Sequence, residues 1–182
     1  MIILASASPR RRELISLISE NVKICPSDVD ETIPESILAE SAPEFLAVKK
    51  AAAVAKDYPF DTVIGCDTSV IVDGIILGKP ADREDAKRML SLLSNKTHKV
   101  ITGCAVFKDG KSVSFSEVTE VKFHALTEAE IEEYLDKNEY ADKAGAYGIQ
   151  GYASLLIEGI NGDYFNVVGL PVSRLSRLLK RF

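Results

Sequence analysis

The residues of this chain that could do chemistry are cations and carboxylates spread over its first half. Seven of these residues have side chains that could together form one binding site, namely Arg10, Arg11, Lys50, Lys79, Asp67, Glu31 and Asp30. This combination suits a polyphosphate substrate, because a nucleoside triphosphate carries roughly four negative charges that must be neutralised during hydrolysis. Carboxylates bind Mg²⁺ or Mn²⁺ through hard oxygen atoms, and they can also orient or deprotonate water.

A predicted helix start brings two of these cations together. Ser8 is a favourable N-cap and Pro9 a favourable first helical residue. The helix then opens on Arg10, Arg11 and Arg12, although a helix N-terminus already carries positive partial charge. An anionic ligand such as a phosphate or carboxylate would compensate this charge. The alternative is that the arginines extend into solvent.

Asp67 is the best candidate for orienting or deprotonating water. It follows the apolar residues Val63 and Ile64 within the predicted strand 61–68, among small and polar residues, so we expect it at the end of that strand. A single aspartate at a strand end is more often a turn or cap residue. Its assignment therefore depends on the combination with the cations.

Several familiar catalytic motifs are missing. Residues 74–80 resemble a phosphate-binding loop, but the spacing of the glycines is one residue short and Pro80 stands where Ser or Thr is needed. There is no HExxH pair and no Gly-x-Ser-x-Gly motif, and His98 and His124 have no obvious nucleophile beside them. Catalysis by histidine is therefore not expected.

Length and composition favour one α/β domain, or two small lobes that share a core. The chain has 182 residues, of which 46% are hydrophobic, and a net charge of −5, which argues against binding nucleic acid through a general positive field. The three cysteines show neither metal-ligand spacing nor an even count, which favours a reducing compartment. The short apolar run at residues 2–5 fits neither a signal peptide nor a membrane span, so we expect a cytoplasmic protein.

The pattern of apolar residues and turn signals predicts a mixed α/β domain around a bent sheet. Ser41 and Glu44 have the spacing of a capping box before a helix over 45–56, with Phe45, Val48 and Ala52 on its buried face. The predicted strands are 2–5, 21–24, 61–68, 69–72, 75–77, 97–107, 112–123 and 153–157, with a tight hairpin turn at Asp73-Gly74. The other predicted helices are 9–18, 82–94, 127–135, which opens on a capping box of Thr127 and Glu130, and 172 to the C-terminus. The glycine-rich segment 142–151 is either a loop that surrounds a ligand or an ordinary connection.

The motifs, in their order along the chain, closely resemble those of the Maf family of nucleoside triphosphate pyrophosphatases. They are residues 6–11, 30–31, 49–51, 67–68, 78–80, 97–98, 102–103, 144–151 and 166–171. The resemblance implies a metal-dependent enzyme that hydrolyses the α–β phosphoanhydride of a nucleotide to the monophosphate and pyrophosphate. It also implies a fold similar to that of the inosine triphosphate pyrophosphatases (Maf/Ham1-like), with two lobes around a central cleft, within a single domain over residues 1–182, and commonly a homodimer.

The resemblance also implies roles for individual residues. The proton acceptor of the family falls on Asp67, and phosphate-binding positions fall on Arg10 and Arg11, with Ser8 at the turn, and on Lys50 and Lys79. Glu31 is expected to contact a Mg²⁺ or Mn²⁺ ion together with Asp67; whether Asp30 shares that role is left open.

Three positions bear on the substrate. Arg11, Thr68 and Gln150 match the branch of the family that acts on dTTP and UTP, and a glutamine amide can both donate to and accept from a pyrimidine edge. The resemblance thus implies hydrolysis of dTTP and UTP, and of modified pyrimidine nucleotides. The alternatives are a pyrophosphatase for 7-methyl-GTP or another modified nucleotide, or a nucleotide-sensing regulator of septum formation.

Overall fold

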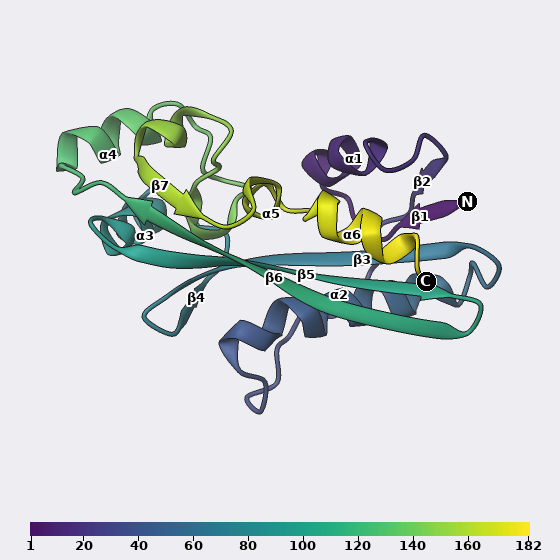
Figure 1. Ribbon diagram of the computed structural model, residues 1–182. Coiled ribbons are helices and arrows are strands. Elements are labelled where there is room, and N and C mark those ends of the chain that lie inside the picture. Colours follow the sequence, from purple (N-terminus) through teal and green to yellow (C-terminus); the bar gives the residue numbers. More distant parts are fainter. The chain divides into compact units, whose positions relative to one another are not determined.

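The computed structural model describes residues 1–182, which form one mixed sheet with helices against it (Figure 1). The strands are β1 (Ile2–Leu4), β2 (Val22–Ile24), β3 (Thr62–Val72), β4 (Ile75–Leu77), β5 (Thr97–Lys108), β6 (Lys111–Phe123) and β7 (Ile157–Asn161). The helices are α1 (Pro9–Ser16), α2 (Ala42–Ala55), α3 (Arg83–Leu93), α4 (Glu128–Leu135), α5 (Tyr164–Val168) and α6 (Val172–Leu179). The strand order is β2-β1-β3-β5-β6-β7, with β4 paired to β3, which confirms the expected mixed α/β class.

The chain divides into two compact units. Unit 1 comprises Met1–Thr68, Thr102–Glu117 and Gly169–Phe182, and unit 2 comprises Ser69–Ile101 and Val118–Val168. The long strands β3, β5 and β6 each contribute residues to both units. Each unit is therefore assembled from segments that are distant in the sequence.

Unit 1 is built on parallel strands. β1 pairs in parallel with both β2 and β3, with Leu4 opposite Ile24 on one side and Ile64 on the other. Parallel strands need covered faces, and Figure 1 shows α1 and α6 on one face of these strands and α2 on the other. Small residues such as Ala47, Ala51 and Ala105 pack with Ile3 and Val63 in the core beneath α2.

The start of α1 confirms the sequence prediction. Ser8 is the N-cap, its hydroxyl oxygen accepts from the backbone N–H of Arg11 at 3.4 Å, and Pro9 is the first helical residue. The cap satisfies one of the N–H groups that a helix start leaves without an intrahelical partner.

The prediction for α2 is wrong in two respects. Ser41 makes no side-chain cap, because a 3₁₀ turn over Ala39–Ser41 precedes the helix and gives Ser41 itself a helical backbone. The buried face is not Phe45, Val48 and Ala52, but a stripe shifted by one residue, namely Leu46, Ala47, Lys50, Ala51 and Val54. This shift places Lys50 on the side of the helix that faces the strands.

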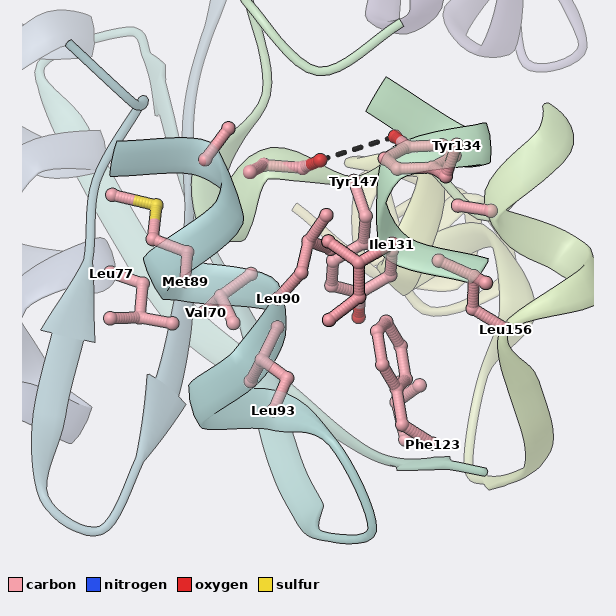
Figure 2. Packing of buried hydrophobic residues seen from close by; sticks show 14 of the residues in the cluster. Val70, Leu77, Met89, Leu90, Leu93, Phe123, Ile131, Tyr134, Tyr147 and Leu156 are labelled. Atoms are coloured by element: carbon pink, nitrogen blue, oxygen red, sulfur yellow. Dashed lines mark hydrogen bonds between the residues drawn. The ribbon is translucent and has the colours of Figure 1, made fainter. Parts of the chain in front are cut away.

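Unit 2 has its own apolar core, shown in Figure 2. Leu90 and Leu93 of α3 pack with Phe123 of β6 and Ile131 of α4, and all four are buried. The Tyr134 hydroxyl donates to the Ala146 carbonyl at 3.1 Å, so the core also holds the glycine-rich segment (Figure 2).

A buried histidine, His98, packs its ring against Phe123 and Tyr147 of this core. The Nε2 atom of His98 lies 2.7 Å from the Tyr147 hydroxyl, and no hydrogen-bond partner faces its Nδ1 atom. Burial lowers the pKa of His98 to about 4. The imidazole is therefore neutral at physiological pH.

Other predictions are confirmed or corrected in unit 2. The hairpin at Asp73-Gly74 and the capping box of Thr127 and Glu130 are present. The strand predicted at 153–157 is instead a 3₁₀ turn over Tyr152–Leu155, and β7 begins only at Ile157, where it pairs with β6. The helix α5 was not predicted, because its five residues are too few for helical periodicity of apolar residues to be recognised in the sequence.

No helix of the protein combines the length and the apolar character that crossing a bilayer requires.

Candidate functional site

Asp67 lies within a strand and not at its end, which corrects the sequence prediction. β3 continues without interruption to Val72, and Asp67 and Thr68 are the half-buried pair in the middle of a run of buried residues. The strand continues because it has β1 beside its first part and β4 beside its last part, so its backbone groups remain paired on both sides of Asp67. Only 13% of the Asp67 side chain is exposed. The sheet therefore holds this carboxylate at a fixed place.

Lys50 is the direct partner of Asp67. Its Nζ atom lies 2.7 Å from Oδ1 of Asp67 and 3.1 Å from Oε1 of Glu31. The Lys50 side chain is 11% exposed, whereas that of Glu31 is 56% exposed. One buried ammonium group thus lies between a buried carboxylate from β3 and an exposed carboxylate from the loop that precedes α2.

Two glycines on the strands allow α2 to come this close. A Cβ atom at Gly65 would lie 2.3 Å from the Ala47 carbonyl oxygen, and one at Gly103 would lie 2.3 Å from the Glu44 backbone nitrogen. Both distances are shorter than any non-bonded contact that carbon tolerates. The glycines therefore set the distance between helix and strands, and with it the distance between Lys50 and Asp67.

Burial and charge act in opposite directions on Asp67. Desolvation raises the pKa of Asp67 above its ordinary value, while the positive charges of Lys50 and Arg11 oppose that rise and Glu31 adds to it. A carboxylate with a raised pKa holds a proton more readily than one in water, which suits it to accept a proton from water.

The structure distinguishes the two acids of the loop. Asp30 turns back on its own chain, where Oδ1 accepts from the backbone N–H of Thr32 at 2.9 Å and from its hydroxyl at 2.6 Å. These bonds lower the pKa of Asp30. Glu31 instead points to Lys50. Glu31, and not Asp30, therefore shares the ammonium group of Lys50 with Asp67.

The donor set fits a magnesium or manganese ion that also binds substrate. No group of three or more His, Cys, Asp or Glu side chains lies in an arrangement that could hold a metal ion by itself. Mg²⁺ commonly uses only one or two carboxylates and takes its remaining ligands from phosphate oxygens and water. The carboxylates of Glu31 and Asp67 are such a pair, because both contact the ammonium group of Lys50.

Arg11 is engaged by the protein itself. Its Nε donates to the Gly169 carbonyl and its Nη1 to the Cys66 carbonyl, both at 2.9 Å, and its Nη2 donates to Oγ1 of Thr68, also at 2.9 Å. Nη1 also reaches the hydroxyl of Ser6 at 3.3 Å. The prediction that the arginines either bind an anion or extend into solvent thus omitted a third use, which is hydrogen bonding to the chain.

The other predicted site residues lie on both units. Ser8 and the half-buried Arg10 stand at the start of α1 in unit 1. Lys79 and Gln150 are exposed residues of unit 2. The segment with Gln150 is held by Glu139, whose Oε2 accepts from the backbone N–H of Tyr152 at 2.8 Å.

Two residues of the site carry roles that sequence reasoning missed. Ser6 is buried and accepts from Arg11 and from the backbone N–H of Ser8 at 3.3 Å. Thr102 is fully buried on β5, and its hydroxyl lies 2.8 Å from that of Thr68. Thr102 belongs to the motif at residues 102–103, and it is also a polar residue within a long apolar strand, but neither signal shows that it contacts Thr68.

Comparisons with known proteins agree with this description. The "Maf-like protein" family model matches residues 1–182. A "dTTP/UTP pyrophosphatase" of Bacillus mycoides (strain KBAB4) is 50% identical over 181 residues, which cover 100% of this chain and 95% of that protein. A protein of the same name from Pyrococcus abyssi (strain GE5 / Orsay) is 49% identical over 180 residues, covering 99% of this chain and 95% of that protein.

Solved structures show the same fold at low sequence identity. The Ham1 protein of Staphylococcus aureus is 16% identical with a TM-score of 0.58, covering 99% of this chain and 98% of that chain. A HAM1 protein of Coxiella burnetii is 15% identical with a TM-score of 0.56, covering 100% and 98%. The family model and the full-length relatives together place the chain in one family: it is a member of the Maf family, with a fold shared by the Ham1 proteins.

Proposed function

We propose that the chain is a nucleoside triphosphate pyrophosphatase that hydrolyses the α–β phosphoanhydride of dTTP and UTP, and of modified pyrimidine nucleotides, to the monophosphate and pyrophosphate. The observation that carries this proposal is the identity of about half of all residues, over the full chain, with relatives named dTTP/UTP pyrophosphatase in both Bacillus and Pyrococcus. The buried Asp67 and Lys50 pair supports it, because a carboxylate beside a cation suits water activation next to an anionic substrate.

In this proposal Asp67 accepts the proton of the attacking water. Its burial within β3 holds the carboxylate in place, and its raised pKa makes it the better proton acceptor. Lys50 keeps the deprotonated carboxylate stable in a buried position and supplies positive charge where phosphate charge develops.

The remaining residues bind and orient the nucleotide. Arg10, at the start of α1 after Ser8, and Lys79 would contact phosphate oxygens, since a helix N-terminus and cationic side chains both favour anions. Gln150 would bind the base through an amide that can donate and accept. A Mg²⁺ or Mn²⁺ ion held by Glu31 and Asp67 would neutralise phosphate charge.

A single assay tests this proposal. The pure protein is incubated with dTTP, UTP, CTP and 7-methyl-GTP in Mg²⁺ or Mn²⁺, in water enriched in ¹⁸O, and the products are resolved by mass. We expect pyrophosphate and a monophosphate from dTTP and UTP, and the position of the isotope shows which phosphorus the water attacks. Orthophosphate as the product, or no turnover of dTTP and UTP, would contradict the proposal.

The same assay separates the alternatives. A 7-methyl-GTP or modified-nucleotide pyrophosphatase would hydrolyse that nucleotide with kcat/KM more than about tenfold above the value for dTTP, a margin that differential transition-state binding readily supplies. A nucleotide-sensing regulator would bind nucleotide without turning it over.

Asp67→Asn tests the role of the carboxylate. It should lower kcat by about 100-fold to 10,000-fold, the usual contribution of a positioned general base, while nucleotide binding stays measurable. Asp57→Asn is the matched control, because it makes the same change at an exposed aspartate just after α2. An active Asp67→Asn enzyme would remove this aspartate from its assigned role.

We also propose that the enzyme is a cytoplasmic homodimer. Sedimentation of the purified protein should give twice the mass of the 19.8 kDa chain, and a monomer at micromolar concentration would contradict this.

A further inference from the structure

We infer that Arg11 is a positioning residue: its guanidinium group fixes the β3 chain on both sides of Asp67, and it does not serve as a phosphate ligand. The inference rests on the proposed function, because it concerns how the proton acceptor of that reaction is held. It changes the role that the family resemblance implies for Arg11, and it follows from the hydrogen bonds of unit 1.

The bonds of Arg11 lie directly before and after Asp67 in the sequence. Nη1 donates to the carbonyl oxygen of Cys66 at 2.9 Å, and Nη2 donates to the hydroxyl oxygen of Thr68 at 2.9 Å. The planar guanidinium group keeps its donors in a rigid fork, so two such bonds restrain both distance and direction. The peptide that carries the Asp67 side chain is therefore held from both ends.

The remaining donors of Arg11 are also committed to the chain. Nε donates to the Gly169 carbonyl at 2.9 Å, and Nη1 contacts the Ser6 hydroxyl at 3.3 Å. An arginine has five N–H donors, and four contacts to protein oxygens leave at most one of them for any ligand. Bidentate binding of a phosphate needs two adjacent donors, so it would require Arg11 to break bonds that hold β3.

The restraint extends to the strand that contacts α2. The Thr68 hydroxyl lies 2.8 Å from that of the buried Thr102 on β5. The next residue, Gly103, is the point at which α2 approaches the strands. Helix α2 also carries Lys50. Through these contacts Arg11 restrains the positions of both Lys50 and Asp67.

Arg11→Lys tests this role in the intact protein. Lysine keeps the positive charge but lacks the planar fork. Positioning predicts that kcat for dTTP falls by about 100-fold, the effect of a displacement of roughly 1 Å at a reacting group, with KM changed by less than about twofold. Arg12→Lys is the matched control, since Arg12 is the exposed neighbour on the same helix and should keep the wild-type kcat.

A second measurement does not depend on turnover. Amide hydrogen exchange of residues 66–68 in the nucleotide-free protein should be faster in Arg11→Lys than in the wild type and in Arg12→Lys. If the wild type hydrolyses no nucleotide, the proposed function fails, but this exchange measurement still tests whether Arg11 restrains β3.

Thr68→Val provides a variant that keeps a β-branched residue suited to a strand. It removes one of the bonds beside Asp67 and should lower kcat in the same direction but less than Arg11→Lys. The inference is overturned if Arg11→Lys raises KM by about tenfold or more while kcat is kept, the result expected for a ground-state phosphate contact. Unchanged exchange at residues 66–68 would overturn it as well.

Discussion

Replacing Lys50 by methionine should destabilise the protein through the charge that it leaves behind. Asp67 and Lys50 are 13% and 11% exposed, so their pair is almost fully withdrawn from water. Breaking a buried ion pair by removing one partner costs about 3 to 5 kcal/mol, because the other charge stays buried without compensation. We expect Lys50→Met to lower the free energy of unfolding by about 3 kcal/mol at pH 8, the lower end of this range. The Asp67 carboxylate is still partly exposed to solvent and can take up a proton, which reduces the cost.

The loss should depend on pH in a defined direction. Burial already raises the pKa of Asp67, and removing Lys50 takes away the main opposing influence, so the pKa of Asp67 rises further in the variant. A carboxylate whose pKa is higher in the folded than in the unfolded state favours folding at low pH, and that contribution is lost as the pH rises through the folded pKa. The variant should therefore be closest to the wild type near pH 5 and furthest from it near pH 8.

Urea denaturation at several pH values measures this difference. A loss of 3 kcal/mol corresponds to a fall in Tm of about 6 to 12 °C for a chain of this length. The double variant Lys50→Met with Asp67→Asn has no uncompensated charge and should recover part of the lost stability, which a double-mutant cycle reports directly. Equal stability of Lys50→Met and wild type at pH 8, or a pH-independent difference, would refute the reasoning.

Three further substitutions probe other parts of the fold. His98 has a pKa of about 4 when folded and an ordinary value of 6.5, so the free energy of unfolding should fall by about 3 kcal/mol as the pH drops from 6.5 to 4. His98→Asn should lose that part of the pH dependence, and an unchanged curve would contradict the assignment. Gly65→Ala should lower Tm measurably, because its Cβ would lie 2.3 Å from the Ala47 oxygen and force α2 outward; a wild-type Tm would mean that α2 shifts at no cost. Glu44→Ala removes the acceptor of two serine hydroxyls at 2.6 and 2.9 Å and should lower the free energy of unfolding by about 2 kcal/mol in urea denaturation. Glu35→Ala, at an exposed glutamate of the loop before α2, is the control.

The features that the sequence predicts well are those decided by neighbours in the chain. The Ser8 cap, the Asp73-Gly74 turn and the box of Thr127 and Glu130 each depend on residues within three positions of one another. Their backbone geometry follows from local hydrogen bonds and from φ preferences, so no other part of the protein needs to be known.

The failed predictions involve partners far away in the sequence. Glu44 has the spacing of a capping box, but its carboxylate accepts instead from Ser114 and Ser116 on β6. In the same way Arg11 reaches Gly169, which lies 158 positions away. A local pattern shows which bonds are available, whereas the tertiary structure determines which of them form.

The candidate site shows the same division. Residue types selected four cations and three acids, and the structure brings three of these seven residues together, namely Asp67, Glu31 and Lys50. The position of Asp67 within β3 could not be predicted, because it depends on β1, which pairs with β3 before Asp67, and on β4, which pairs with β3 after it. The close approach of α2 likewise depends on Gly65 and Gly103, whose role is visible only once helix and strands are adjacent.

The assembly of unit 1 from separate segments also affects the order in which the protein can fold during synthesis. Unit 2 is complete once Val168 has left the ribosome, whereas unit 1 needs Gly169–Phe182 as well. The carbonyl of Gly169 accepts a hydrogen bond from Arg11, and α6 belongs to the same unit, so Arg11 gains this partner only after the 157 residues between them have been made. Translation takes several seconds to tens of seconds over such a length, at about 5 to 20 residues per second. Until α6 is made, the apolar strands β1 and β3 lack its cover, so their exposed apolar surface can associate with other chains.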